Sequence, residues 1–347
     1  MLFANRPSGF CTVLTVLKGK HAIPQTRKAL QLLWENNVQF IFLTNGGGVP
    51  ESEKAEQLSR VLGVPVNPDH LIMSHSPMRD LVPLYKSKNV MVVGGQHSSC
   101  KRVMEMYGFR HLVTPEEIHA IHPAVCPLSV CATRPLPFDD PGVISKLYLY
   151  FLLLAWLVVC LQEHVRNAGK TIDAVMMLHD STDWGRDLQL CLDALVSKNG
   201  VLGTIKDTEE LRTTKQSVPI YFSNPDIHLT GQTLEFTSYG KPNTITYRYV
   251  ENVLDKVSPM PVDANGLSVS KRTVYAVGDN PYSDIAGANE QGWQSVLVKT
   301  GVFRTHGYQN HHLHPASVVV DHVEAAVRWI IAQEEMKAQQ SGREPAR

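Results

Sequence analysis

Short apolar runs, rich in β-branched and aromatic residues, alternate with helical or loop stretches in two separated parts of the chain. In the first part, Val38–Leu43 (VQFIFL) follows a stretch whose apolar residues recur at helical spacing. The second part contains four such runs, at Val218–Phe222, Thr273–Val277, Ser295–Val298 and Ser317–Val320. Strands joined through helices pair in parallel and are covered on both faces, so this pattern predicts an α/β fold with a parallel sheet.

A middle region interrupts this pattern and has strand candidates of its own at Val90–Val93 and Ile172–Leu178. Because the first pattern resumes after it, we predict that the middle region is an inserted α/β domain. The predicted boundaries are 8–78 and 218–335 for a discontinuous core domain, 79–217 for the inserted domain, and 336–347 for a disordered tail.

The composition narrows the class of partner. Lys plus Arg and Asp plus Glu both total 33, so the formal net charge is zero. Nucleic-acid binding usually needs a basic field, so nucleic acid is not expected as a partner. The six cysteines are scattered without a zinc pattern, which favours reduced thiols. The opening segment MLFANRPSGF has no clear targeting sequence.

An unusual apolar insertion at 142–165 contains an unbroken apolar run from Leu147 to Leu161. A membrane span needs about 20 apolar residues, so this shorter run favours a buried helix, and membrane association is not expected. Its position in an otherwise ordinary domain also suggests intron-derived sequence from an altered splice form or gene model. The sequence leaves these alternatives open, as it does the oligomeric state.

The strongest local signal for chemistry is the segment Gly278–Asp284 (GDNPYSD), which follows a strand candidate directly. Its two acids, Asp279 and Asp284, are expected at the carboxyl end of that strand, the edge of parallel sheets where ligands bind. Carboxylate oxygens are ligands that Mg²⁺ prefers, which makes this pair a candidate metal site. The competing interpretation is that both aspartates only cap turns and the following helix.

Two further segments supply groups that suit a phosphate. Thr44, Asn45 and Gly46 end an earlier strand candidate with a hydroxyl, an amide and exposed backbone. Lys241, in the turn Gly240–Pro242, supplies a cation. Each segment alone is a common turn composition.

In the order Thr44, Lys241, Asp279, these segments resemble the haloacid dehalogenase superfamily of hydrolases. With Ser223–Asp226 and Gly240–Pro242, the order is similar to the subclass with a large C2-type cap, and SHSPM with YAVGDNPYSDIAGAN resembles a mitochondrial member of it. The resemblance implies a Rossmann-like core with a C2-type cap. It also implies a Mg²⁺-dependent phosphatase of small phosphorylated metabolites and a mitochondrial location, with the cytoplasm as the alternative.

The resemblance also implies roles for individual residues. It assigns catalysis to Thr44, Asn45 and Lys241, substrate binding to Gly46, Asn224, Asp183 and Arg186, and the metal to Asp279 and Asp284. For the segment Asp180–Asp187, the favoured alternative is structural, with Asp183 capping a helix and Trp184 packing within the domain.

One departure weakens the implied activity. The family's first strand ends in an Asp-x-Asp pair that supplies the nucleophile and the general acid, but this chain has Cys11–Thr15 in that place and no acid before Glu35. A thiolate of Cys11 is a poor Mg²⁺ ligand and lacks a second acid two positions later, so we do not expect it to substitute. The chain is therefore expected to be inactive, and a non-catalytic protein that binds a ligand or partner is the alternative function.

The sequence also supports structural expectations for the first strand and for two other segments. If Gly9–Leu17 does not pair as a strand, the central sheet has an unfilled slot and stability is marginal. The run is apolar and β-branched enough to fill the slot. The cluster His311–His314 is expected in an exposed loop, not in a metal site, and Gly94–Gln96 in a turn without the spacing of a nucleotide fingerprint.

Overall fold

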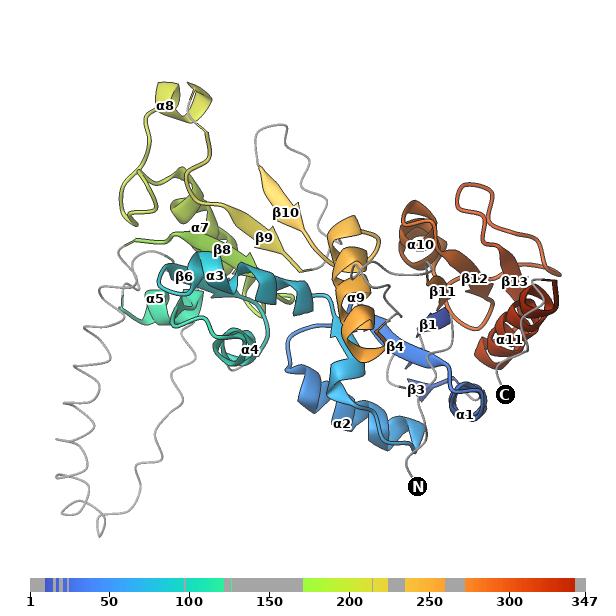
Figure 1. Ribbon diagram of the computed structural model, residues 1–347. Coiled ribbons are helices and arrows are strands. Elements are labelled where there is room, and N and C mark those ends of the chain that lie inside the picture. The colour runs from blue at the N-terminus through green and yellow to red at the C-terminus, as the bar shows by residue number, and fades with distance from the viewer. Residues whose placement is uncertain are drawn as a thin grey trace, which may run out of the picture. The chain divides into compact units, whose positions relative to one another are not determined.

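The structure is a computed structural model that describes residues 10–14, 17–18, 21–23, 25–96, 98–121, 126, 171–213, 215–223, 235–259 and 272–340. The chain divides into two compact units (Figure 1). The core unit is Met1–Pro77 with Tyr239–Arg347, and the inserted unit is Met78–Ser238.

The core unit is built on a six-stranded sheet with the order β13-β12-β11-β1-β4-β5, in which every pairing is parallel. Its strands are β1 Phe10–Leu14, β4 Gln39–Thr44, β5 Leu71–Met73, β11 Thr273–Gly278, β12 Gln294–Val298 and β13 Val318–Val320. A separate two-stranded hairpin pairs β2 Leu17–Lys18 with β3 His21–Ala22. The predicted α/β fold with a parallel sheet is thus confirmed.

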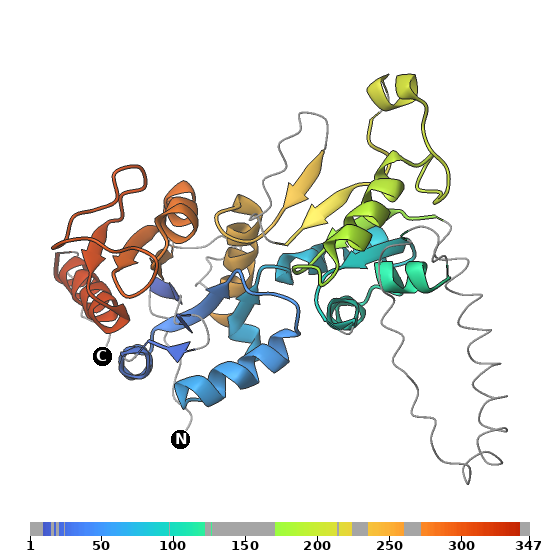
Figure 2. The same cartoon turned by 180° about the vertical axis from the view of Figure 1, so that it is seen from behind.

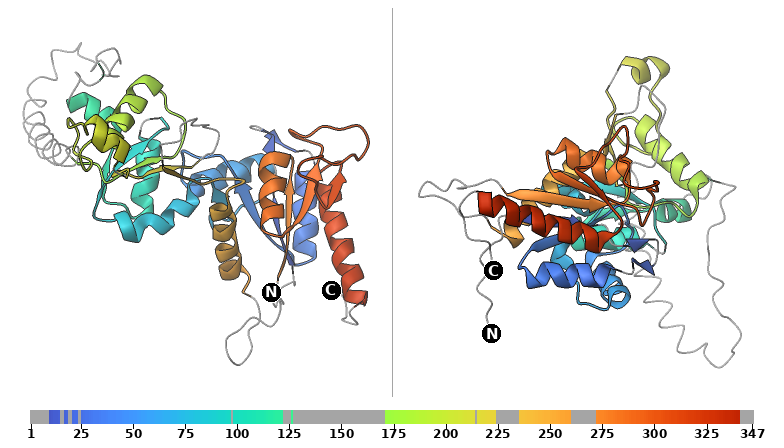
Figure 3. Two further views of the ribbon diagram at one scale, coloured as in Figure 1. Left: turned by 90° about the horizontal axis from the view of Figure 1, so that it is seen from above. Right: turned by 90° about the vertical axis from the view of Figure 1, so that its right-hand side faces the viewer.

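Helices cover both faces of this sheet because the strands are apolar on both sides. One face packs on α1, α2 and α11 and the other on α9 and α10; in the left view of Figure 3, α9 and α11 lie on opposite sides of the strands. The helices of this unit are α1 Thr26–Glu35, α2 Glu51–Leu62, the short helices η1 Pro68–His70 and η2 Ser76–Leu81, α9 Thr244–Val257, the π-helical turn η5 Pro281–Ile285, α10 Ala286–Glu290 and α11 Val323–Gln340. Gly63 ends α2 in the left-handed conformation that glycine favours, with φ 67°.

Strand β1 fills the central slot of the sheet. It pairs with β11 on one side and β4 on the other, with Leu14 opposite Val277 and Phe42. Residues 11–14 are all buried. Their side chains include the β-branched Thr12 and Val13, which suit a strand that is covered on both faces. The condition under which we expected a marginal core, an unpaired first strand, is therefore not met.

The inserted unit has its own parallel sheet, with the order β10-β9-β8-β6-β7. Its elements are α3 Val82–Tyr85, β6 Asn89–Val93, α4 Ser99–Tyr107, β7 His111–Val113, α5 Pro115–Ile121, β8 Ala174–Met177, α7 Trp184–Val196, α8 Thr208–Thr213, β9 Ile220–Phe222 and β10 Phe236–Ser238. Helices α5 and α7 share one apolar core with the strands, and Figure 2 shows α7 alongside β8 and β9 from behind.

Two predicted boundaries were wrong. The run Val218–Phe222 was assigned to the core domain, but its residues Ile220–Phe222 form β9 in the sheet of the inserted unit, which extends to Ser238. A short buried run does not identify which of two parallel sheets it joins. The tail predicted from residue 336 starts too early, since α11 continues to Gln340.

The whole insertion at 142–165, with its apolar run Leu147–Leu161, lies outside the described residues, so the interpretations given above stay predictions. Among the helices within the described ranges, none has the length and apolar content needed to cross a bilayer.

Candidate functional site

Three segments that are far apart in sequence meet at the carboxyl edge of the core sheet. Strand β4 ends at Thr44 and β11 ends at Gly278, and β1 lies between these two strands. The turn that carries Lys241 bonds to the end of β4 through Asn45 and to the segment after β11 through Asp284. The sequence predicted this edge as the ligand site, and the parallel topology brings the segments together there.

A buried ion pair lies at the centre of the site. Lys241 Nζ is 2.7 Å from Asp284 Oδ1, and the two side chains are 7% and 6% exposed. The ammonium also donates to the carbonyl oxygen of Leu43, at 3.2 Å. A buried charge needs both a counter-charge and hydrogen bonds, and this arrangement supplies both.

Asp284 is fixed by its own segment as well as by Lys241. Its Oδ2 accepts from the backbone N–H groups of Asp279 and Asn280, at 3.1 and 3.0 Å. A Cβ at Gly278 would lie 2.2 Å from the Asp284 Cβ, so only glycine allows this close approach. The Tyr247 hydroxyl, buried on α9, donates to the carbonyl oxygens of Ser283 and Asp284 at 3.0 and 3.2 Å. Asp284 is therefore a rigid part of the site.

Asp279 is held differently, by the loop that follows β12. The N–H of Val302 donates to Asp279 Oδ2 at 2.6 Å, and a Cβ at Gly301 would lie 1.7 Å from the same oxygen. Burial raises the pKa of the Asp279 carboxyl above its ordinary value, and the nearby charge of Asp284 acts in the same direction. The Val302 N–H and Lys241 oppose this shift in pKa without cancelling it. The fold thus holds a carboxylate in a place that disfavours its charge, as functional sites often do.

This shift in pKa predicts how stability depends on pH. A carboxyl whose pKa is raised by folding binds protons more tightly in the folded state, so stability falls as pH rises from the unfolded pKa through the folded pKa. We expect Asp279→Asn to be more stable than the parent at pH 7, with the difference shrinking as pH falls below the ordinary range of aspartate. Urea unfolding between pH 3.5 and 7 measures this. Asp80→Asn, at an exposed aspartate, controls for the substitution itself, and parallel curves for Asp279→Asn and parent would contradict the prediction.

The threonine and asparagine at the end of β4 are partly engaged within the protein. The Gly46 N–H donates to Thr44 Oγ1 at 3.0 Å, so this amide turns back to the hydroxyl and does not point outward to cradle an anion. Asn45 bonds through its side chain to both backbone polar groups of Lys241. Thr44 remains half-buried at the edge, beside the Lys241–Asp284 pair.

The substrate-binding residues predicted outside this cluster have other surroundings. Asn224 lies outside the described residues. In the inserted unit, Asp183 caps α7 by accepting from the Arg186 N–H at 3.1 Å, as the structural alternative predicted. The Arg186 guanidinium is buried and bonds to Asp187 and Glu116, so the contacts given for it are structural. Trp184 is 37% exposed and does not pack inside the unit.

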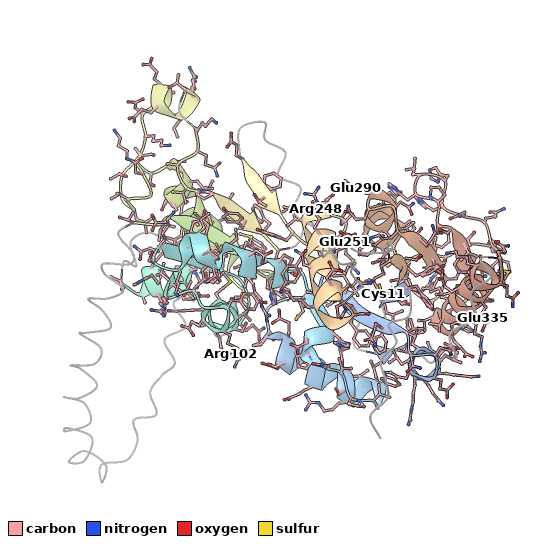
Figure 4. The ribbon with its side chains drawn as sticks, in the orientation of Figure 1. Cys11, Arg102, Arg248, Glu251, Glu290 and Glu335 are labelled. Atoms are coloured by element: carbon pink, nitrogen blue, oxygen red, sulfur yellow. The ribbon has the colours of Figure 1, made fainter. Side chains whose placement is uncertain are left out.

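Cys11 occupies the interior of the core and not the edge. It is 0% exposed and packs between the sheet and α9, near Glu251 (Figure 4). Its partners are Gln39 and Val274, five residues before Thr44 and Asp279 on the neighbouring strands. At about 3.3 Å per residue this places Cys11 roughly 16 Å from the edge. Burial raises the pKa of its thiol to about 12, so it is not a nucleophile at neutral pH.

The donor set for a metal is incomplete. Within the described ranges, no cluster of three His, Cys, Asp or Glu side chains could hold a metal ion. Of the two carboxylates, Asp284 is already bonded to the Lys241 ammonium. The residues that the structure describes therefore do not by themselves supply the several oxygen ligands that Mg²⁺ requires, and the phosphate binding proposed below for the unmodified chain involves no metal.

Several supporting groups could not be identified from the sequence. Tyr247 and the backbone of Leu43 and Val302 contact the site residues directly. Tyr247 had only an apolar helical pattern around it, and backbone groups leave no signal in residue type. Gly301 carried one weak signal, since a glycine in the turn three residues after the end of β12 can permit a close approach.

The histidine cluster lies beside this site in the loop between β12 and β13. The rings of His311 and His314 stack at 5.8 Å, and Tyr282 contacts both edge-on. His311 Nδ1 accepts from the His314 N–H at 3.1 Å. His312 is exposed, and this loop has the exposed character that the sequence predicted.

The architecture is thus that of a capped α/β protein, with a parallel sheet, a lysine–carboxylate pair at its carboxyl edge and an inserted α/β unit. Residues 15–110 match the family of haloacid dehalogenase-like hydrolases, and residues 238–326 match a family described as HAD-hydrolase-like. A mitochondrial hydrolase of Saccharomyces cerevisiae is 31% identical over 330 residues, which cover 83% of this chain and 85% of that protein. The chain therefore belongs to the haloacid dehalogenase-like hydrolase family.

A second relative is longer than this chain. The cardiolipin synthase (CMP-forming) / mitochondrial hydrolase fusion protein of Schizosaccharomyces pombe is 32% identical over 348 residues, covering 91% of this chain and 51% of that protein. This chain thus spans about half the length of that relative.

Solved structures share the fold. A hypothetical protein of Pyrococcus horikoshii superposes with a TM-score of 0.57 at 18% identity, covering 92% of this chain and 98% of its own. A p-nitrophenyl phosphatase of Archaeoglobus fulgidus gives a TM-score of 0.55 at 15% identity, covering 93% and 99%. The predicted Rossmann-like core with a C2-type cap is thereby confirmed.

The family match on the N-terminal side begins at residue 15, directly after the last residue of β1. The segment Cys11–Thr15, in which the sequence lacks the expected aspartates, thus precedes the matched region except for its last residue. Strand β1 lies between β11 and β4 in the sheet and contains no acidic residue.

Proposed function

We propose that this chain keeps the phosphate-sized site of a haloacid dehalogenase-type phosphatase and, in its present sequence, binds a small phosphorylated molecule without hydrolysing it. The observation that supports this is the bonded convergence of Lys241 with Asn45 on one side and Asp284 on the other. No nucleophilic carboxylate stands in β1 beside this cluster. A phosphatase with a metal bound at Asp279 and Asp284 is the family activity that this site has lost.

The proposed binding chemistry uses groups already in place. The Lys241 ammonium supplies positive charge at low exposure, where its attraction to a phosphate dianion is stronger than in water. The Thr44 hydroxyl, which accepts from the Gly46 N–H, can donate its own proton to a phosphoryl oxygen. Asp284 balances the lysine when no anion is present. Each role is an inference from position and chemistry.

The test is binding of inorganic phosphate to the purified, unmodified chain, followed by calorimetry, beside turnover of 4-nitrophenyl phosphate. We expect saturable binding with turnover at background. Thr44→Val, which removes the hydroxyl at nearly constant volume, should raise the Kd for phosphate about tenfold or more, the value of one hydrogen bond to a charged group. Thr213→Val, in α8 of the inserted unit, is the matched control and should bind like the parent. Absence of phosphate binding would remove the proposal, and turnover by the unmodified chain would restore the enzyme interpretation.

We also propose a mitochondrial location, because both relatives described above carry the word mitochondrial in their names. Fractionation of cells that express the tagged chain tests this. Recovery in the cytosolic fraction alone would contradict it.

A further inference from the structure

Asn45 forms a two-point contact with the peptide groups of one distant residue. The Lys241 N–H donates to Asn45 Oδ1 at 2.7 Å, and Asn45 Nδ2 donates to the Lys241 carbonyl oxygen at 3.0 Å. The two residues are 196 positions apart in sequence. The contact therefore joins the two parts of the core unit, which the inserted unit separates in the sequence. A single side chain thus satisfies both backbone polar groups of the lysine.

This contact restrains the residue whose ammonium forms the buried ion pair with Asp284. Fixing the backbone of Lys241 on both sides of its Cα sets the direction in which its side chain leaves the chain. From that point the ammonium reaches Asp284 Oδ1 and the carbonyl oxygen of Leu43. Since Asn45 directly follows Thr44, the same contact fixes the distance between the threonine hydroxyl and the lysine.

We propose that Asn45 is a positioning residue, which affects a bound phosphate only through Lys241. This differs from the role that family resemblance implies, in which the asparagine holds the phosphoryl group itself. Asn45 Oδ1, which points at the Lys241 N–H, is turned toward the protein and not toward a ligand. The inference deepens the proposed function, because phosphate binding is one of its readouts, but the Asn45–Lys241 contact does not depend on phosphate.

A double-mutant cycle separates the two roles. We expect Asn45→Ala to raise the Kd for inorganic phosphate about tenfold, which corresponds to losing the restraint of two hydrogen bonds. In the Lys241→Met background the same substitution should change the Kd by less than about twofold, because a residue that acts through Lys241 has nothing left to act on. An equal loss in both backgrounds would show direct contact with the phosphate and overturn the proposal.

A spectroscopic measurement tests the same proposal without phosphate. The ¹⁵N resonance of the Lys241 ammonium reports its bonds to Asp284 and Leu43. We expect this resonance to shift in Asn45→Ala and exchange of the Lys241 amide hydrogen to accelerate at least about tenfold, since a protecting hydrogen bond is lost. Asn45→Asp keeps the acceptor for the Lys241 N–H, so protection of that amide should be retained there.

Asn36→Ala is the matched control, because Asn36 also donates from its side chain to a backbone carbonyl, that of Leu32 at the end of α1. It should leave the Lys241 signals in place. An unchanged Lys241 resonance and exchange rate in Asn45→Ala would overturn the proposal. If the unmodified chain binds no phosphate, the proposed function fails while these NMR signals still decide the role of Asn45.

Discussion

A chain with Thr15→Asp and Leu17→Asp should hydrolyse 4-nitrophenyl phosphate in the presence of Mg²⁺, at a rate on the order of 10³-fold or more above the unmodified chain, because it regains the class of nucleophile it lacks. The register of β1 is described up to Leu14, and Thr15 and Leu17 are the first positions after it that keep the Asp-x-Asp spacing. Leu14 pairs with Phe42 and Val277, each two residues before Thr44 and Asp279. Thr15 directly follows Leu14 in the chain, so these substitutions add the two acids just after β1 in the sequence.

The matched control places the same two acids earlier in the strand. Cys11→Asp with Val13→Asp keeps the Asp-x-Asp spacing, but both side chains belong to the core packed against α9. We expect no hydrolysis and a less stable protein, because buried carboxylates without partners are costly. Measured rates and urea midpoints of the two variants check this. Activity of the Cys11/Val13 variant alone would show that the register of β1 differs from the one described.

The second large effect is expected on stability. Lys241→Met should lower the free energy of unfolding by about 3–5 kcal/mol, because it leaves the Asp284 carboxylate buried without its counter-charge. The side chains of both partners are less than a tenth exposed. Adding Asp284→Asn to Lys241→Met should recover a large part of this loss, since the double variant no longer buries a charge. Urea unfolding followed by tryptophan fluorescence gives the three values.

Lys198→Met serves as the control for the loss of a lysine. Its ion pair with Glu210 spans 3.3 Å between side chains that are 53% and 40% exposed, so solvent screens it. The unfolding free energy of this variant should stay close to that of the parent. If Lys241→Met behaved in the same way, the Lys241–Asp284 pair would not be the buried centre of the site.

Together these experiments separate two properties that a hydrolase usually combines. The Lys241 variants test whether the charged centre is built into the fold, and the Thr15/Leu17 variant tests whether that centre still supports catalysis once carboxylates return. A stable centre that gains activity only with the added acids is the outcome expected of a family member that retained its site after losing its nucleophile.

Much of the fold could be predicted from the sequence because its signals are local. The apolar runs at Val90–Val93 and Thr273–Val277 became β6 and β11 with nearly the same bounds. Their continuous apolar character reflects burial on both faces of a parallel sheet, which needs no knowledge of partners. The run at Val218–Phe222 was placed in the wrong sheet, because strand pairing is a long-range choice that local composition does not encode.

The candidate site, like the fold, could be predicted from the sequence only in part. The identities of Thr44, Lys241, Asp279 and Asp284, and their place at strand ends or in turns, followed from the sequence and its family resemblance. The contacts between these residues did not follow from the sequence. The absence of acids before Glu35 was also visible in the sequence, but only the sheet register revealed that Cys11 lies well inside the strand.

The sequence by itself thus determined the class of fold, the order of the chemical groups along the chain and the absence of acidic residues before Glu35. The tertiary structure decided that β1 fills the central slot, that Asn45 binds the backbone of Lys241, and that Tyr247 and Val302 support the two aspartates. The physical reason is the sequence separation over which each kind of interaction acts. Residue type and spacing record what each segment prefers locally, whereas hydrogen bonds and ion pairs between segments depend on distances that only the packed chain sets.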